Sequence, residues 1–160
     1  MDAQHSVWSA RVDGALRRHL AGRDVPQGLG AAVRDALFPG GARVRPTLAI
    51  GVALACGDDR PLVADALACA VEFLHCASLV HDDMPCFDDA AVRRGRPTVH
   101  RAHGEATALL AGDGLIFLAF QALADVGEDA AERLPALLKI VAESGGSPSG
   151  LVAGQAMESE

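Results

Sequence analysis

The segment Pro61–Asp83 decides the fold, and it reads PLVADALACAVEFLHCASLVHDD. It contains no glycine, and it is rich in alanine and leucine, which have high intrinsic helix propensity. Pro61 suits the first position of a helix, and Pro85 ends the helical pattern. We therefore predict one long, mostly apolar helix over residues 61–83, at the centre of an all-α fold.

The rest of the chain predicts further helices, which glycine and proline separate. No stretch alternates apolar and polar residues for long enough to indicate a strand. A charged loop is expected over residues 84–101. A chain of 160 residues is typical of a single domain. From apolar spacing and breakers, helices are predicted at 3–21, 29–38, 46–56, 104–125 and 130–143, and from Leu151 onward.

Composition disfavours several functional classes. Half of the residues are hydrophobic, 22% are charged and the net charge is −7, so nucleic acid is a poor partner. No uninterrupted apolar run reaches the roughly 18 residues that a membrane span needs. The first residues, MDAQHS, lack the basic and apolar regions of a signal peptide. We expect a cytoplasmic protein with no membrane span.

The residues that carry chemistry concentrate in His81–Arg101, where the charges are segregated by sign. Asp82 and Asp83 lie at the C-terminal end of the predicted helix, where the helix dipole disfavours each carboxylate by about 0.3–1 kcal/mol. A divalent cation would offset this cost, and Mg²⁺ prefers carboxylate and phosphate oxygens. Arginine binds phosphate with two donors. The pattern indicates a magnesium–diphosphate site, with a solvated charged turn as the alternative, and its charged residues are Asp82, Asp83, Asp88, Asp89, Arg93, Arg94, Arg96 and Arg101.

A second basic segment, GGARVRP at residues 40–46, precedes the predicted helix 46–56. Its glycines leave the backbone free, and a helix N-terminus binds anions through unpaired N–H groups. The segment is a candidate anion site, and a glycine turn with exposed arginines fits it equally well.

The polar residues inside the predicted helix 61–83 share one narrow stripe. Such a stripe is either a thin solvent-facing surface or the wall of a cavity with a polar rim. Its members are Asp65, Glu72, His75, Ser78 and Asp82.

Other chemistries fit the sequence less well. Composition alone leaves a Ser–His–Asp triad open, but the chain has no Gly-x-Ser-x-Gly elbow. It also has no P-loop and no Gly-x-Gly-x-x-Gly motif. A zinc site is disfavoured because no common structural spacing joins its candidate ligands, His75, Cys76, His81 and Cys86.

Together these motifs resemble those of the trans-polyprenyl (isoprenyl) diphosphate synthases. Residues 40–46 resemble the Gly-Gly-Lys-Arg-x-Arg-Pro motif of that family. Asp82–Asp88, followed by Arg-Arg-Gly at 93–95, resembles the first aspartate-rich motif in its form with four intervening residues. The likeness is strongest to the geranylgeranyl diphosphate synthase type of photosynthetic and carotenoid-making proteobacteria. It covers nearly the whole chain, but only about the first half of a typical member.

The resemblance implies a helical bundle of the isoprenoid synthase type, of which residues 1–160 would be the N-terminal part of a single domain. The second aspartate-rich motif of the family is not in this sequence, so we expect residues 1–160 alone to show no prenyl transfer. The parent protein would be a homodimeric transferase of isoprenoid and carotenoid biosynthesis. It would condense isopentenyl diphosphate with dimethylallyl, geranyl or farnesyl diphosphate to make geranylgeranyl diphosphate. The alternatives are a farnesyl diphosphate synthase, a non-catalytic prenyl-synthase-like subunit, and a terpene cyclase or other Mg²⁺-diphosphate lyase.

The resemblance also assigns roles to the charged residues. Asp82 and Asp88, with Asp83, would hold the Mg²⁺ that bridges the allylic diphosphate, and Arg93 would contact the same diphosphate.

The diphosphate of isopentenyl diphosphate would be bound by Arg45, His75 and Arg94. Ala42 stands where the family has a lysine, which removes one charged contact and is expected to weaken affinity for this substrate.

The helix 61–83 also bears on product length. Ser78 and Ala77 precede Asp82 by four and five residues, which is about 6–7.5 Å along a helix. Farnesyl-making relatives tend to carry an aromatic residue near there that closes the cavity, so the small Ala77 favours a C20 product. Phe73, one turn further from the acids, would form the floor.

Overall fold

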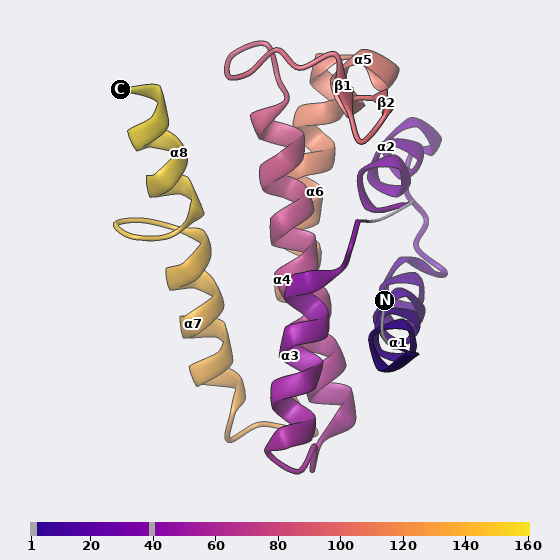
Figure 1. Ribbon diagram of the computed structural model, residues 1–160, viewed down its shortest axis with the longest axis vertical. Helices are drawn as coiled ribbons and strands as arrows, with labels where there is room; N and C mark the ends of the chain where they lie inside the picture. The colour runs from indigo at the N-terminus through magenta and orange to yellow at the C-terminus, as the bar shows by residue number, and fades with distance from the viewer. Residues whose placement is uncertain (1–2, 39–40) are drawn as a thin grey trace. The chain divides into compact units, whose positions relative to one another are not determined.

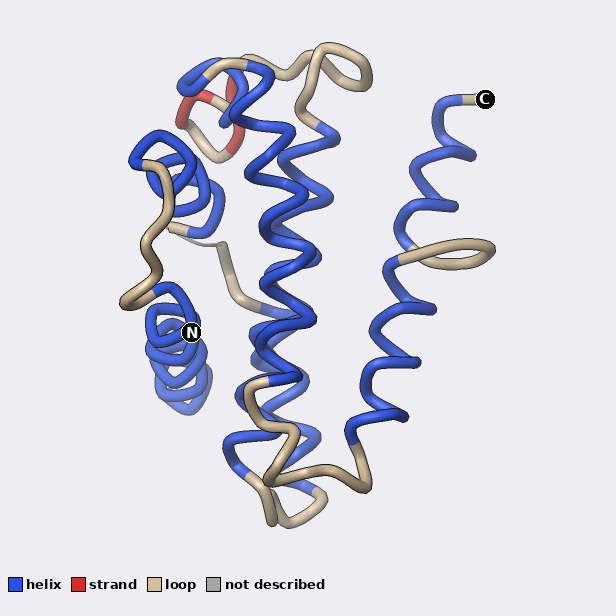
Figure 2. Tube along the Cα trace, turned by 180° about the vertical axis from the view of Figure 1, so that it is seen from behind, coloured by secondary structure: helices blue, strands red, loops and turns tan. Residues whose placement is uncertain are grey.

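A computed structural model of the chain describes residues 3–38 and 41–160. In this part of the chain nearly all regular structure is helical, which confirms the all-α prediction, and one two-stranded hairpin interrupts it (Figures 1 and 2). The elements are α1 (Ala3–Leu20), α2 (Gln27–Leu37), α3 (Val44–Ala55), α4 (Pro61–Asp82), β1 (Val92–Arg93), β2 (Arg96–Pro97), α5 (Val99–His103), α6 (Glu105–Ala124), α7 (Leu134–Gly145) and α8 (Leu151–Ser159).

The structure differs from the sequence prediction at several element boundaries. The expected loop 84–101 holds the hairpin and the start of α5. Helix α3 begins two residues before Pro46, because proline is tolerated in the first turn, where its missing N–H has no helical partner. Helix α7 begins later than predicted, after a run of turns. The expected break at residues 39 and 40 lies outside the described residues.

The described residues group into two compact units. Unit 1 comprises residues up to 23, 41–72 and 118–141, and unit 2 comprises residues 24–38, 73–117 and 142–160. In unit 1, α1 packs on α3, and a Cβ built on Gly51 would lie 3.1 Å from the ring of Trp8. The fully buried side chains of this unit include Leu16, Ile50 and Leu123.

Ion pairs in unit 1 account for two of the five residues in the polar stripe of α4. Glu72 is 3% exposed and accepts a bond of 2.5 Å from the buried guanidinium of Arg43, which also pairs with Asp13 at 3.0 Å. Asp65 accepts a bond of 2.6 Å from Arg11. These two acids therefore hold unit 1 together, and neither sequence interpretation, solvent face or cavity wall, describes them.

Unit 2 is built from the end of α4, the hairpin, α5 and their neighbours. Helix α2 packs on α5, whose first two residues, Val99 and His100, are buried. Phe73, Cys76 and Val80 form the buried face of this part of α4. The C-terminal end of α4, which carries the predicted acids, is thus set in a packed environment.

Helices α4 and α6 are long and apolar enough to cross a membrane by length and composition alone. The most apolar 18-residue stretch of α4 is 56% buried within the structure, and that of α6 is 44% buried. Core helices of soluble proteins meet the same criterion, so these two helices are weak evidence for a membrane span.

The buried Arg43–Glu72 pair should dominate the stability of unit 1. We expect Glu72→Ala to lower the free energy of unfolding by about 3 kcal/mol, because it removes a buried counterion of the buried Arg43 guanidinium. Denaturant titration followed by circular dichroism measures this loss. Arg133→Ala, which removes the exposed pair with Asp59 in the same unit, is the control and should leave the midpoint nearly unchanged. Equal midpoints for the two variants would contradict the expectation.

Candidate functional site

The acidic loop, residues 83–90, folds back onto the C-terminal end of α4. The backbone N–H of Asp88 donates to the carbonyl of Asp82 at 3.0 Å, and that of Ala90 donates to the carbonyl of Asp83 at 3.1 Å. The last carbonyls of a helix have no partner within the helix, and the loop supplies partners for these two. The loop therefore returns the backbone of Asp88 to the end of α4 that carries Asp82 and Asp83.

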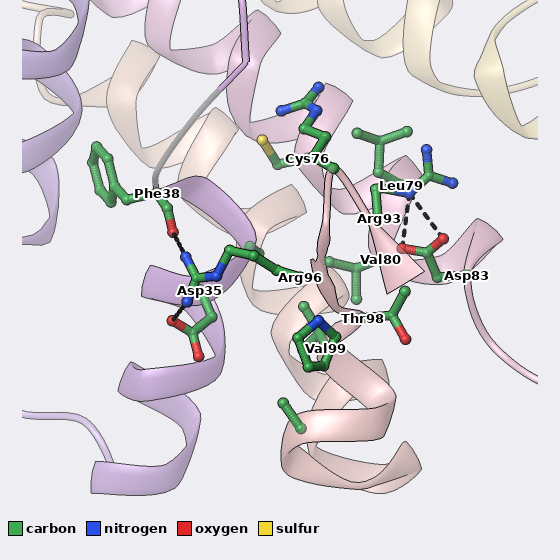
Figure 3. A pocket seen from close by; sticks show the side chains of 14 residues that line it. Asp35, Phe38, Cys76, Leu79, Val80, Asp83, Arg93, Arg96, Thr98 and Val99 are labelled. Atoms are coloured by element: carbon green, nitrogen blue, oxygen red, sulfur yellow. Dashed lines mark hydrogen bonds and ion pairs between the residues drawn. The ribbon is translucent and has the colours of Figure 1, made fainter. Parts of the chain in front are cut away.

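Arg93 pairs with both acids at the end of α4. Its Nε donates to both carboxylate oxygens of Asp83, at 2.8 and 2.9 Å, and its second terminal nitrogen donates to Asp82 at 3.1 Å (Figure 3 shows the contacts with Asp83). Asp82 also accepts a bond of 3.1 Å from Gln155. Burial raises the pKa of Asp83 above its ordinary value, and the contact with Arg93 opposes that rise. The arginine thus offsets the repulsion that the sequence predicts there.

The hairpin is what presents the arginines. Arg93 on β1 faces Arg96 on β2 across a two-residue turn, and both turn residues, Arg94 and Gly95, have positive φ (53° and 77°). Such turns match the twist of the strands, and glycine is common in them. Arg93, Arg94 and Arg96 all line one cavity of about 290 Å³, together with Asp83 on the α4 side.

The same cavity has apolar walls and a second acid. Leu79, Val80 and Val99 line it, and Arg96 donates to the backbone carbonyl of Phe38 at 3.3 Å (Figure 3). Arg96 also pairs with Asp35 at 3.6 Å. This arrangement joins an arginine-rich rim to a small apolar pocket, which suits an anionic ligand with a short hydrocarbon group.

Asp82 lines a second, larger and mainly apolar cavity of about 790 Å³. Ala77, Ser78 and Leu74 of α4 line it, as do Leu109 and Ile116 of α6 and residues of the segment 145–159. Two of the three residues predicted to limit product length, Ala77 and Ser78, are therefore cavity residues. Phe73 is fully buried and is not among the lining residues, so its role as the floor stays a prediction.

The remaining predicted residues are distributed between the units. Arg45 is exposed in the first turn of α3, in unit 1. His75 belongs to α4 in unit 2 and lines neither cavity. Asp88 is exposed in the acidic loop. Asp89, which was not assigned to the metal, pairs with Arg101 at 2.8 Å.

The all-oxygen donor set at the end of α4 fits a hard cation such as Mg²⁺. In residues 3–38 and 41–160, no three His, Cys, Asp or Glu side chains stand close enough together to hold a metal ion. Arg93 occupies the carboxylates of Asp82 and Asp83, and the third acid of the predicted set, Asp88, belongs to the loop beside them. The carboxylate oxygens of Asp82, Asp83 and Asp88 are the kind of donor that magnesium prefers, but in the described residues these three side chains do not converge on one point.

Sequence reasoning overlooked the contact between His81 and Gly112. A Cβ built on Gly112 would overlap the imidazole ring of His81, whose Nε2 lies 3.4 Å from the carbonyl of Leu109 and 3.7 Å from Asp113. Only glycine leaves room for this ring next to Asp82. Gly112 inside a predicted helix was a signal that could have pointed to such a close approach.

Gly112→Ala and Gly114→Ala should therefore have opposite effects on stability. Gly112→Ala must displace His81, so we expect it to lower the free energy of unfolding by about 1–3 kcal/mol. Gly114 lies in the same helix, and a Cβ there would meet no heavy atom within 4 Å. Gly114→Ala should raise the free energy of unfolding by about 0.4–1 kcal/mol, because alanine reduces the freedom of the unfolded chain. Denaturant titration measures both variants, and effects of the same sign would contradict the packing described here.

Residues 26–160 match the family model for polyprenyl synthetase, and the chain belongs to this family. It is 51% identical over 157 residues to a geranylgeranyl diphosphate synthase of Cereibacter sphaeroides, an alignment that covers 96% of this chain and 54% of the relative. It is 42% identical over 154 residues to a farnesyl diphosphate synthase of Geobacillus stearothermophilus, covering 93% and 50%. The chain thus spans about half the length of the curated relatives it matches.

A solved structure shows the same fold. The crystal structure of a geranyltransferase from Legionella pneumophila superposes with a TM-score of 0.89 at 34% identity, covering 96% of this chain and 54% of that one. The prediction of an isoprenoid synthase type of helical fold is confirmed.

Proposed function

We propose that the chain is the N-terminal part of a single polyprenyl synthetase domain, and that the whole protein makes geranylgeranyl diphosphate from isopentenyl diphosphate and an allylic diphosphate. One observation carries the proposal. Asp82 lines the large apolar cavity, while Arg93, which binds Asp82 and Asp83, lines the small one. A charged centre for two diphosphates therefore lies beside a space for hydrocarbon. The identity to a geranylgeranyl diphosphate synthase supports the product assignment.

In this proposal Asp82, Asp83 and Asp88 would hold Mg²⁺, which would supply charge stabilisation to a leaving diphosphate. Arg93 already donates to the acids and adds donors for the diphosphate oxygens. The C–O bond of the allylic substrate breaks, and the diphosphate leaves with the electron pair. The apolar walls of the large cavity, Ala77 and Leu74 among them, keep water from the allylic cation.

The double bond of isopentenyl diphosphate then attacks the cation, and a proton is lost to the released diphosphate. Arg94 of the small cavity binds the diphosphate of this second substrate, with His75 and Arg45. The last two roles rest on the family resemblance alone. A homodimeric state, a cytoplasmic location and a place in carotenoid biosynthesis belong to the same proposal.

Product analysis tests the proposed function. The full-length product of the gene is incubated with farnesyl diphosphate, isopentenyl diphosphate and Mg²⁺, beside residues 1–160 alone. We expect a C20 diphosphate from the full-length protein and none from residues 1–160. A hydrocarbon product formed without isopentenyl diphosphate would instead indicate a cyclase, and no product from the full-length protein would contradict the proposal.

Asp82→Asn should abolish most of this activity. The substitution removes one proposed Mg²⁺ ligand and so weakens stabilisation of the charge that develops on the leaving diphosphate. We therefore expect kcat to fall by about 100-fold or more. Asp24→Asn makes the same change at an exposed position of unit 2 outside both cavities, and serves as the control. Steady-state assays at saturating Mg²⁺ give the comparison, and equal kcat values would refute the metal assignment.

Ala77→Phe should shorten the product, because the ring would fill the large cavity next to the site of chain growth. We expect the product to shift from C20 toward C15, read by chromatography of the dephosphorylated alcohols. Ala136→Phe, at an exposed position of α7 that lines neither cavity, is the matched control. An unchanged distribution in the Ala77 variant would refute the role of this residue as a cavity wall.

A further inference from the structure

His100 is a buried histidine that the proposed reaction does not use. It lies in α5, directly after the hairpin, and its side chain is 2% exposed. Its Nδ1 lies 3.1 Å from the hydroxyl of Thr98. Its Nε2 is buried, has no hydrogen-bond partner among the described residues, and lies 3.7 Å from a carboxylate oxygen of Asp89. The ring is therefore placed between the segment that leaves the hairpin and the acidic loop.

The hydrogen-bond partners of the Thr98 hydroxyl determine which nitrogen of the His100 ring carries a hydrogen. The Thr98 hydroxyl lies 2.7 Å from the carbonyl of Ala90, and a carbonyl only accepts, so the single hydroxyl hydrogen is donated there. The hydroxyl can then only accept from His100, whose Nδ1 must carry a hydrogen. The other ring nitrogen, Nε2, faces Asp89.

These contacts fasten the end of the acidic loop. Ala90 donates its N–H to Asp83 and accepts the Thr98 hydroxyl, and the N–H of Thr98 donates to Ala91 at 3.2 Å. Arg101, the neighbour of His100, pairs with Asp89. The end of the loop is thus bonded both to α4 and to the start of α5, with His100 at the buried side of the connection.

We propose that His100 is a positioning residue for the acidic loop, which acts through Thr98 and holds Asp88 beside the end of α4. The inference rests on the proposed function, in which Asp82, Asp83 and Asp88 would bind one cation. Mg²⁺ demands near-ideal ligand geometry, and groups that orient metal ligands affect affinity nearly as directly as the ligands do. His100 itself contacts neither substrate nor metal in this proposal.

Binding of Mn²⁺ in the presence of inorganic diphosphate tests the role of His100 without an assay of turnover. The full-length protein is titrated, and free Mn²⁺ is followed by electron paramagnetic resonance. We expect His100→Ala to weaken Mn²⁺ binding about 10-fold, the usual effect of losing a group that orients metal ligands. His100→Asn keeps a donor at the place of Nδ1 and should recover most of the affinity. His103→Ala is the control, since His103 is in the same helix but pairs with Asp35, and it should bind like the wild type.

Thr98→Val is the second test, because valine keeps the shape of threonine and removes only the hydroxyl. It should weaken Mn²⁺ binding as His100→Ala does, and circular dichroism checks that each variant is folded. Any of three results would overturn the inference: wild-type binding in either folded variant, failure of His100→Asn to recover affinity, or an equal loss in His103→Ala.

Asp82→Asn distinguishes a failure of the proposed function from a failure of the role of His100. If it binds Mn²⁺ like the wild type, the proposed function fails. If it loses binding while His100→Ala does not, only the role of His100 fails.

Discussion

The carboxylates at the C-terminal end of α4 are the constraint on which the rest of unit 2 depends. Asp82 and Asp83 lie where the helix dipole is negative, and Asp83 is also buried, so both need a nearby positive charge. Arg93 provides it, and it reaches the acids because a tight hairpin follows the loop. The cost of placing charge at this helix end therefore explains why loop, hairpin and arginine occur together.

One helix also sets the distance between charge and hydrocarbon. Asp82 and Ala77 lie on the same α4, so the separation between the acid and the cavity wall follows from the helical rise. A chain that grows from this centre would meet the same wall residues in every turnover. The Arg43–Glu72 pair in unit 1 shows the other use of polar residues on α4, which is structural.

The sequence predicted the helices well and marked the acids and arginines that lie together after α4, because helix propensity and charge depend on local patterns. Alanine-rich composition and flanking prolines identify α4, and the segregated charges identify the acids and arginines. The hairpin escaped prediction because strands of two residues are too short to show alternation. The ion-pair partners of Asp65 and Glu72 escaped it too, because they lie 54 and 29 residues away along the chain.

By itself the sequence determined an all-α chain with an acidic segment and a basic segment close in order, because helix propensity and charge are local properties. Only the tertiary structure decided which arginine neutralises Asp83, which residues line each cavity, and that His81 needs the space left by Gly112. The same holds for the position of His100 between Thr98 and Asp89. Such contacts depend on how separate segments pack, and packing depends on shape and partner groups that no single segment contains.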